Sequence, residues 1–321
     1  MQTSYAFISS YKQRITNLDR AIQNNQRQQQ QTQRHGPVEY RKLTQRFRQF
    51  LADEDRFWTQ LILRLYRLFG LHEAQPALYV IGILGRTDDI VPPTSAAAAE
   101  GGPVVEIRDG VMHGSNGRNH FQFPPEDPAV SFAPTTPEEG ASRMAILTKA
   151  VICLGDIARY RELYNESGGR ARAGHEDVSF STRRGRNRRG GAAAVAIEAL
   201  PRLKTYEKAQ LCYEQARLLV PYEGNPSHQL AILASYKKDS FTSLVHYYRA
   251  LCVRQPYDTA AENLGIVLSK ALDLWRQRAR RGEKHVVDTP PAPRVRIEAF
   301  KEKVIVLHAL WRVGLDKGIE K

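Results

Sequence analysis

The stretch AQLCYEQARLLVP at residues 209–221 is followed, 34 residues later, by SLVHYYRALCVRQP at residues 243–256. Both stretches place a small residue, an aromatic residue and a second small residue at steps of four and three, with a proline after them. Such steps put the three side chains on one face of a helix, and proline cannot continue that helix. We therefore expect an all-α chain of antiparallel helical hairpins. The matching residues are Ala209, Tyr213, Ala216 and Pro221, then Ser243, Tyr247, Ala250 and Pro256.

This pattern is typical of the second helix of a tetratricopeptide unit, where small residues let two helices approach. The first helix of the same unit is predicted in VICLGDIARYREL, residues 151–163, in which Leu154 and Gly155 occupy the Leu-Gly position of the repeat. One hairpin cannot bury its apolar face alone, so such units stack and curve around a concave groove.

Arg159 is the unusual residue of this predicted helix, because apolar residues cover both sides. One apolar stripe consists of Ala150, Cys153, Leu154, Ile157 and Tyr164. Arg159 lies on the other side, near Ile152, Gly155 and Leu163. Two interpretations stay open from this helix alone. Asp156, three residues earlier, could form an exposed ion pair with Arg159 that contributes little stability, or Arg159 could face the concave groove.

Three stretches without helical periodicity interrupt the chain, at about residues 23–37, 86–140 and 168–200. The first is rich in glutamine, the second in proline, glycine and alanine, and the third in arginine and glycine, compositions that do not build a core. Apolar spacing predicts a long helix over about residues 38–71 and another from Ala141. We expect the three stretches to be loop or disordered insertions, the third of which splits a helical hairpin.

The net charge of +13 predicts an anionic partner, which could be nucleic acid, a phosphorylated protein or an acidic surface. Part of the excess is local, because residues 168–200 contain seven arginines and three acidic residues. The segment STRRGRNRRGG resembles arginine-glycine segments that bind nucleic acid while disordered. Its candidate contacts are Arg183, Arg184, Arg186, Arg188 and Arg189.

Other classes of protein find little support. No apolar run is long enough to span a bilayer, and the N-terminus lacks the pattern of a secretory signal, so we expect no membrane contact and a place inside the cell. The cysteines, Cys153, Cys212 and Cys252, lie in apolar helical patterns and are predicted to be buried thiols. The histidines are scattered, and no glycine-rich phosphate loop follows a strand. We expect no enzyme, metal or cofactor.

Three stretches together resemble a known family: LGDIARYRE at residues 154–162, the run from Tyr213 to Leu272, and IEAFKEKVIVLHALW at residues 297–311. They are similar to the telomerase-associated Ever Shorter Telomeres proteins and to the related adaptors of nonsense-mediated mRNA decay, with the decay branch favoured. The likeness is dense from Ile146 to Leu272 outside the insertions. It implies a 14-3-3-like tetratricopeptide domain over residues 1–272 and the incomplete beginning of a C-terminal helical-hairpin region over residues 273–321.

The resemblance also implies a function, the binding of phosphoserine or phosphothreonine peptides in a basic groove. It implies that Arg159 and Lys12, in SSYKQRITNL, are pocket cations and that Tyr160 is a third phosphate contact. His228 stands where the family usually has an asparagine that holds the peptide backbone, which weakens that contact here. The implied partner is a phosphorylated RNA helicase of mRNA decay, in cytoplasm and nucleus, with a homo- or heterodimer of family members expected.

A second hypothesis is that the chain is a telomerase-associated regulator that binds single-stranded telomeric DNA or RNA through the arginine-rich insertion. Aromatic residues suited to base stacking do not alternate with these arginines, since Phe180 is the nearest. We therefore rank recognition of a phosphorylated protein first.

Overall fold

The computed structural model describes residues 2–27, 36–85, 123–124, 132–164, 204–281 and 292–319. These residues form helices and no strand, apart from an isolated bridge between Glu223 and Gln255, so the all-α prediction is confirmed for them. The elements are α1 (Gln2–Arg27), α2 (Gly36–Leu68), the short η1 (His72–Ala74), α3 (Gln75–Val80), α4 (Pro137–Leu163), α5 (Glu207–Leu219), α6 (Asn225–Tyr236), α7 (Ser240–Leu251), α8 (Thr259–Arg280) and α9 (Pro293–Ile319).

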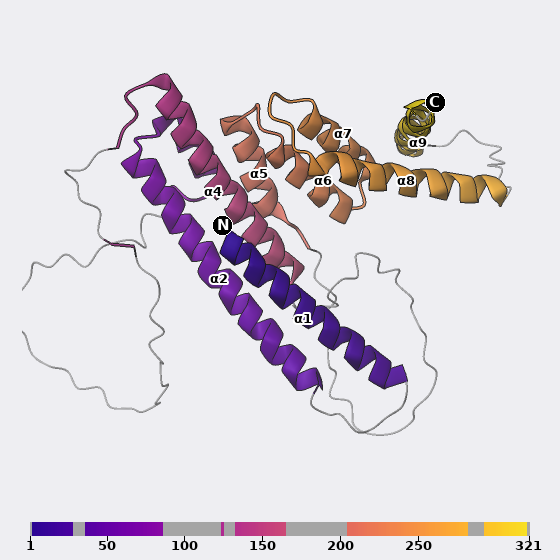
Figure 1. Ribbon diagram of the computed structural model, residues 1–321, viewed down its shortest axis with the longest axis horizontal. Coiled ribbons are helices and arrows are strands. Elements are labelled where there is room, and N and C mark those ends of the chain that lie inside the picture. Colours follow the sequence, from indigo (N-terminus) through magenta and orange to yellow (C-terminus); the bar gives the residue numbers. More distant parts are fainter. Residues whose placement is uncertain are drawn as a thin grey trace, which may run out of the picture.

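The helices α1 and α2 pack against each other, and α2 also packs against α4 (Figure 1). Ile8, Ile15 and Ile22 repeat every seven residues on α1 and are all buried. Because seven residues complete about two helical turns, the three side chains form one stripe. Aromatic rings also contribute to the packing of α1 against α2, since Tyr11 stacks on Phe47 of α2 with ring centroids 5.0 Å apart.

Helix α4 is the centre of the fold and lies between α2 and α5 (Figure 1). All residues from Ala150 to Arg159 are buried, as expected for a helix covered on every side. Gly155 sets its distance from α5. A Cβ atom at this position would lie 2.6 Å from Cε1 of Tyr213, so only glycine allows the observed approach. The Leu-Gly position of the repeat thus has a steric reason.

The helices from α5 to α8 continue as packed hairpins on the other side of α4 (Figure 1). The small and aromatic residues of the repeat pattern are buried in both units: Ala209, Tyr213, Ala216, Ser243, Tyr247 and Ala250. A second core lies farther along the array, where Leu264, Leu268 and Leu272 of α8 meet α9. Within the described residues, no helix combines the length and apolar composition needed to cross a bilayer.

Three of the approximate insertion boundaries fall inside helices. Helix α1 continues to Arg27 and α2 begins at Gly36, so both ends of the insertion placed at 23–37 are helical. Helix α4 begins at Pro137 rather than at Ala141, because the hydroxyl of Thr136 accepts a hydrogen bond from the Glu139 amide and caps the helix. Residues 86–122, 125–131 and 165–203 lie outside the described residues.

The predicted division into domains at residues 272 and 273 falls inside α8, which runs without a break from Thr259 to Arg280. Nothing in the helix marks that point, and the division stays a prediction.

Candidate functional site

Arg159 points from α4 toward α6 and is almost completely buried, with 7% of its surface exposed. One terminal nitrogen, Nη2, donates to Oδ1 of Asp156 at 3.0 Å. The other, Nη1, donates to the hydroxyl of Tyr236 at 3.3 Å. The Nε atom is buried and has no hydrogen-bond partner among the described residues, and the guanidinium carbon lies 4.8 Å from the ring centroid of Tyr160. Arg159 therefore uses two of its five N–H donors in hydrogen bonds with the described residues.

Asp156 is the acceptor at the centre of this cluster and has 3% of its surface exposed. Three side chains from three helices donate to it: Arg159 of α4, Tyr213 of α5 at 2.6 Å and Tyr5 of α1 at 2.5 Å. Asp156 does pair with Arg159, but the pair is buried rather than exposed. The small energy of a solvent-exposed ion pair therefore does not apply.

Three groups of this cluster, Arg159, Tyr5 and Tyr213, have shifted pKa values. Burial opposes the charge of Arg159, but the negative charges of Tyr213, once it is ionised at high pH, and of Asp156 outweigh that effect and hold the pKa of Arg159 above its ordinary value. Burial raises the pKa of the Tyr5 and Tyr213 hydroxyls, and the negative charge of Asp156 raises both further. Both tyrosines consequently stay protonated and act as donors.

Lys12 reaches the same place from α1. Its Nζ lies 5.3 Å from the ring centroid of Tyr160. Because Arg159 lies on the same ring, the two cationic groups are at most about 10 Å apart. Among the residues that the structure describes, Lys12 forms no ion pair. The structure thus brings together three of the four predicted contacts, Lys12, Arg159 and Tyr160.

Within the described residues, His228 forms no hydrogen bond or ring contact with these three, although the charge of Arg159 acts on its ring. It is buried on α6, where its ring contacts Tyr257 with centroids 4.7 Å apart and its Nε2 lies 2.9 Å from the amide nitrogen of Asn263. An amide nitrogen can only donate, so Nε2 accepts and the ring proton sits on Nδ1, which has no partner among the described residues. Burial, with help from Arg159, lowers the pKa of His228 to about 4. A contact between His228 and a bound peptide stays a prediction.

Sequence reasoning missed the tyrosines that surround Arg159 and Asp156. Tyr213 carried a signal, since it is the aromatic residue of the repeat pattern, but that pattern explains its ring and not its hydroxyl. Tyr5 and Tyr236 carried no signal, because they come from helices far away in the sequence.

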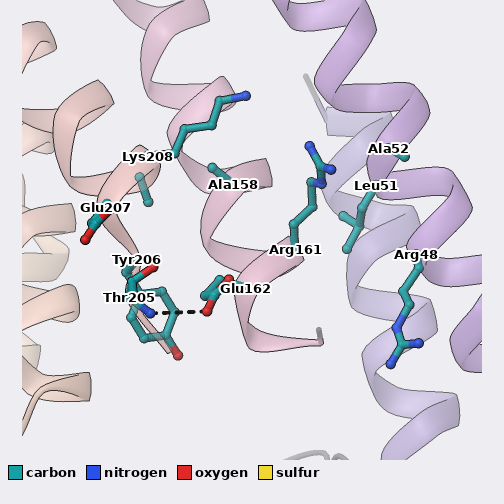
Figure 2. A pocket seen from close by; sticks show the side chains of 11 residues that line it. Arg48, Leu51, Ala52, Ala158, Arg161, Glu162, Thr205, Tyr206, Glu207 and Lys208 are labelled. Carbon is teal, nitrogen blue, oxygen red and sulfur yellow. Dashed lines mark hydrogen bonds between the residues drawn. The ribbon is translucent and has the colours of Figure 1, made fainter. Parts of the chain in front are cut away.

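A separate hollow of about 510 Å³ is lined by residues of α2, α4 and α5 and by the two residues before α5 (Figure 2). Its cations already have partners, since both Arg161 and Lys208 bind Asp55 at 2.7 Å. Two of its lining residues are joined by a hydrogen bond of 3.1 Å from the Thr205 amide to Glu162. Tyr160, Lys12 and Asp156 do not line this hollow.

The predicted nucleic-acid contacts Arg183, Arg184, Arg186, Arg188 and Arg189 lie outside the described residues, and their role stays a prediction.

Comparison with known proteins relates the chain to one family. Residues 1–165 match the family model described as telomerase activating protein Est1, and residues 209–310 match the model described as Est1 DNA/RNA binding domain. The nonsense-mediated mRNA decay factor SMG7 of Arabidopsis thaliana is 34% identical over 122 residues, which cover 38% of this chain and 8% of the relative.

Two zebrafish proteins are also similar. SMG7 of Danio rerio is 46% identical over 66 residues, 21% of this chain and 6% of the relative. The telomerase-binding protein EST1A of Danio rerio is 29% identical over 133 residues, 41% of this chain and 6% of the relative. The matched part spans a tenth or less of the length of each curated relative.

Proposed function

The chain belongs to the telomerase activating protein Est1 family, and on that basis we propose that it is a non-enzymatic adaptor that binds phosphoserine or phosphothreonine peptides. Lys12 and Arg159 bind the phosphate in this proposal, and Tyr160 orients both cations.

The observation that carries the proposal is the meeting of two cations from α1 and α4 on one aromatic ring. Lys12 and Arg159 are 147 positions apart in the sequence, and each lies within 5.3 Å of the Tyr160 centroid. A phosphorylated serine carries a charge of about −1.5 to −2 and three acceptor oxygens. Charge-assisted bonds from arginine are among the strongest hydrogen bonds in proteins, and two cations on different helices recognise a phosphate by its position.

The phosphate must compete with Asp156 for Arg159, and the surroundings of Asp156 favour this exchange. Asp156 keeps two donors, the hydroxyls of Tyr5 and Tyr213, when Arg159 turns away. A buried carboxylate with two remaining hydrogen bonds is far less costly than one without any.

We propose a phosphorylated RNA helicase of mRNA decay as the partner, which places the protein in the cytoplasm and the nucleus. The supporting observation is the likeness to two decay factors named SMG7. A homo- or heterodimer with a family member stays part of this proposal.

A binding assay tests the phosphate site directly. A fluorescent degenerate peptide library with a fixed phosphoserine is titrated with the protein, beside the same library with serine. We expect binding of the phosphoserine library alone. Removal of a charge-assisted contact weakens binding by about 2 kcal/mol, so Lys12→Ala and Arg159→Gln each raise the Kd of the phosphoserine library more than tenfold.

Lys270→Ala is the matched control, because this exposed lysine of α8 lies outside the cluster. It leaves the Kd unchanged if the two proposed cations act locally. Equal binding of both libraries to the wild-type protein, or equal loss with Lys270→Ala, rejects the proposed site.

A second candidate function is the binding of single-stranded DNA or RNA, favoured by the match of residues 209–310 to a model described as a DNA/RNA binding domain. The excess of positive charge supports it. Nucleic-acid binding of this kind weakens steeply with added salt, because cations displace counterions from phosphates. Titration of a labelled oligonucleotide at rising salt, with and without residues 168–200, tests this candidate. A salt-independent affinity, or no loss on deletion, contradicts a role for the insertion.

A further inference from the structure

We propose that Asp156 is an internal competitor for Arg159 that admits phosphate to the site and excludes the carboxylates of aspartate and glutamate. This inference rests on the proposed function and names the ligand class that the same site selects.

Arg159 is already bound in the free protein. Its side chain is 9% exposed and that of Asp156 is 5% exposed, with 3.0 Å between Nη2 and Oδ1. Tyr236 holds the second terminal nitrogen of the guanidinium. An anion that reaches Arg159 must therefore take it from a carboxylate that is already in place.

The carboxylate of an acidic peptide gains no free energy by replacing Asp156 at Arg159. It carries the same single charge and offers the same two oxygens as Asp156. Asp156 lies on the same helix, three residues before Arg159, so pairing with Arg159 costs no translational entropy. A peptide loses translational entropy when it binds. An acidic peptide consequently does not displace Asp156.

A phosphate differs from Asp156 in charge and in shape. It has a higher negative charge and a third oxygen. The third oxygen can reach Lys12 while the other two bind Arg159, since both cations share the ring of Tyr160. Asp156 does not pair with this second cation, since Lys12 forms no ion pair among the described residues, and its remaining hydrogen bonds are made with Tyr5 and Tyr213.

The same two tyrosines set how tightly Asp156 holds Arg159. Tyr5 and Tyr213 donate to different oxygens, Oδ2 and Oδ1, at 2.5 and 2.6 Å. They stabilise the carboxylate when Arg159 leaves. Loss of one hydroxyl makes Asp156 depend more on Arg159 and makes the exchange with phosphate harder.

Two variants with opposite expected effects test the inference. Asp156→Asn removes the competing charge, so the phosphoserine library binds about tenfold more tightly, and a library with glutamate at the fixed position now binds more tightly than the serine library. Tyr5→Phe weakens phosphoserine binding about threefold, in line with the modest contribution of one hydrogen bond. Tyr5 is 38% exposed, so this variant is expected to fold even if Asp156→Asn does not.

Asp55→Asn is the matched control, since Asp55 also pairs with an arginine of α4, Arg161, which lines a hollow that Tyr160 does not line. It leaves all three affinities unchanged. Inorganic phosphate gives a second readout without any peptide, and it raises the Tm of Asp156→Asn more than the Tm of the wild type.

The outcomes separate the two proposals. A wild-type protein that binds serine and phosphoserine libraries equally overturns the proposed function. A wild-type protein that prefers phosphoserine, with Asp156→Asn or Tyr5→Phe showing no change or the opposite change, overturns the role of Asp156 alone. Tight binding of the glutamate library to the wild type also overturns it.

Discussion

Replacement of Gly155 by alanine is expected to destabilise the protein, although alanine favours helices more than glycine does. Gly155 lies inside α4 where this helix touches α5. The new Cβ would lie 2.6 Å from Cε1 of Tyr213 and 3.0 Å from Cβ of Cys212. Neither neighbour can rotate away easily, because Tyr213 is fully buried and the Cβ of Cys212 is fixed to the backbone.

Three contributions determine the size of the effect. The better helix propensity of alanine stabilises by about 1 kcal/mol. Overpacking at α5 costs about 1–3 kcal/mol. Displacement of Tyr213 weakens its hydrogen bond of 2.6 Å to the buried Asp156 carboxylate, and a bond to a charged group contributes about 1.5–3 kcal/mol. Since two unfavourable contributions oppose one favourable contribution, we expect a loss of about 2–4 kcal/mol.

Urea unfolding followed by circular dichroism measures this loss. Gly314→Ala in α9 is the matched control, because its Cβ would meet nothing within 4 Å. The control is expected to be neutral or to stabilise by up to about 1 kcal/mol. If Gly155→Ala is as stable as the control, α4 and α5 do not approach as closely as described, and the steric account of the Leu-Gly position fails.

Two other substitutions give independent tests. Gly224→Ala places its Cβ 2.2 Å from the carbonyl oxygen of Ala250, which is backbone, so urea unfolding should show a loss of at least about 3 kcal/mol. The pKa of His228 is lowered from 6.5 to about 4, so the unfolded chain binds a proton that the folded chain does not. The contribution of His228 to the free energy of unfolding is fully present above pH 6.5. It falls by about 1.4 kcal/mol per pH unit as the pH drops toward 4. His228→Asn should reduce the dependence of the free energy of unfolding on pH, measured by urea titrations between pH 4 and 6.5. An unchanged dependence would contradict this role of His228.

The helical hairpins could be predicted from the sequence because their signal is local. Steps of three and four residues describe one helix face, and the 34-residue recurrence from Tyr213 to Tyr247 describes one repeat. The ends of helices were less predictable. Helix α4 begins four residues before its predicted start, because the hydroxyl of Thr136 caps it. The polar residues before Arg27 are part of α1, although their composition predicted a loop.

The candidate site could be described only from the sequence and the tertiary structure together. The sequence alone determined that Arg159 lies on a helix covered on both sides, and the family resemblance joined it to Lys12. Only the tertiary structure decided that the two cations share the ring of Tyr160 and that Arg159 is bound to a buried carboxylate. The physical reason is that helical periodicity acts over a few neighbouring residues, whereas the hydroxyl of Tyr5 reaches Asp156 across 151 positions of the chain. Such a contact exists only once the helices have packed.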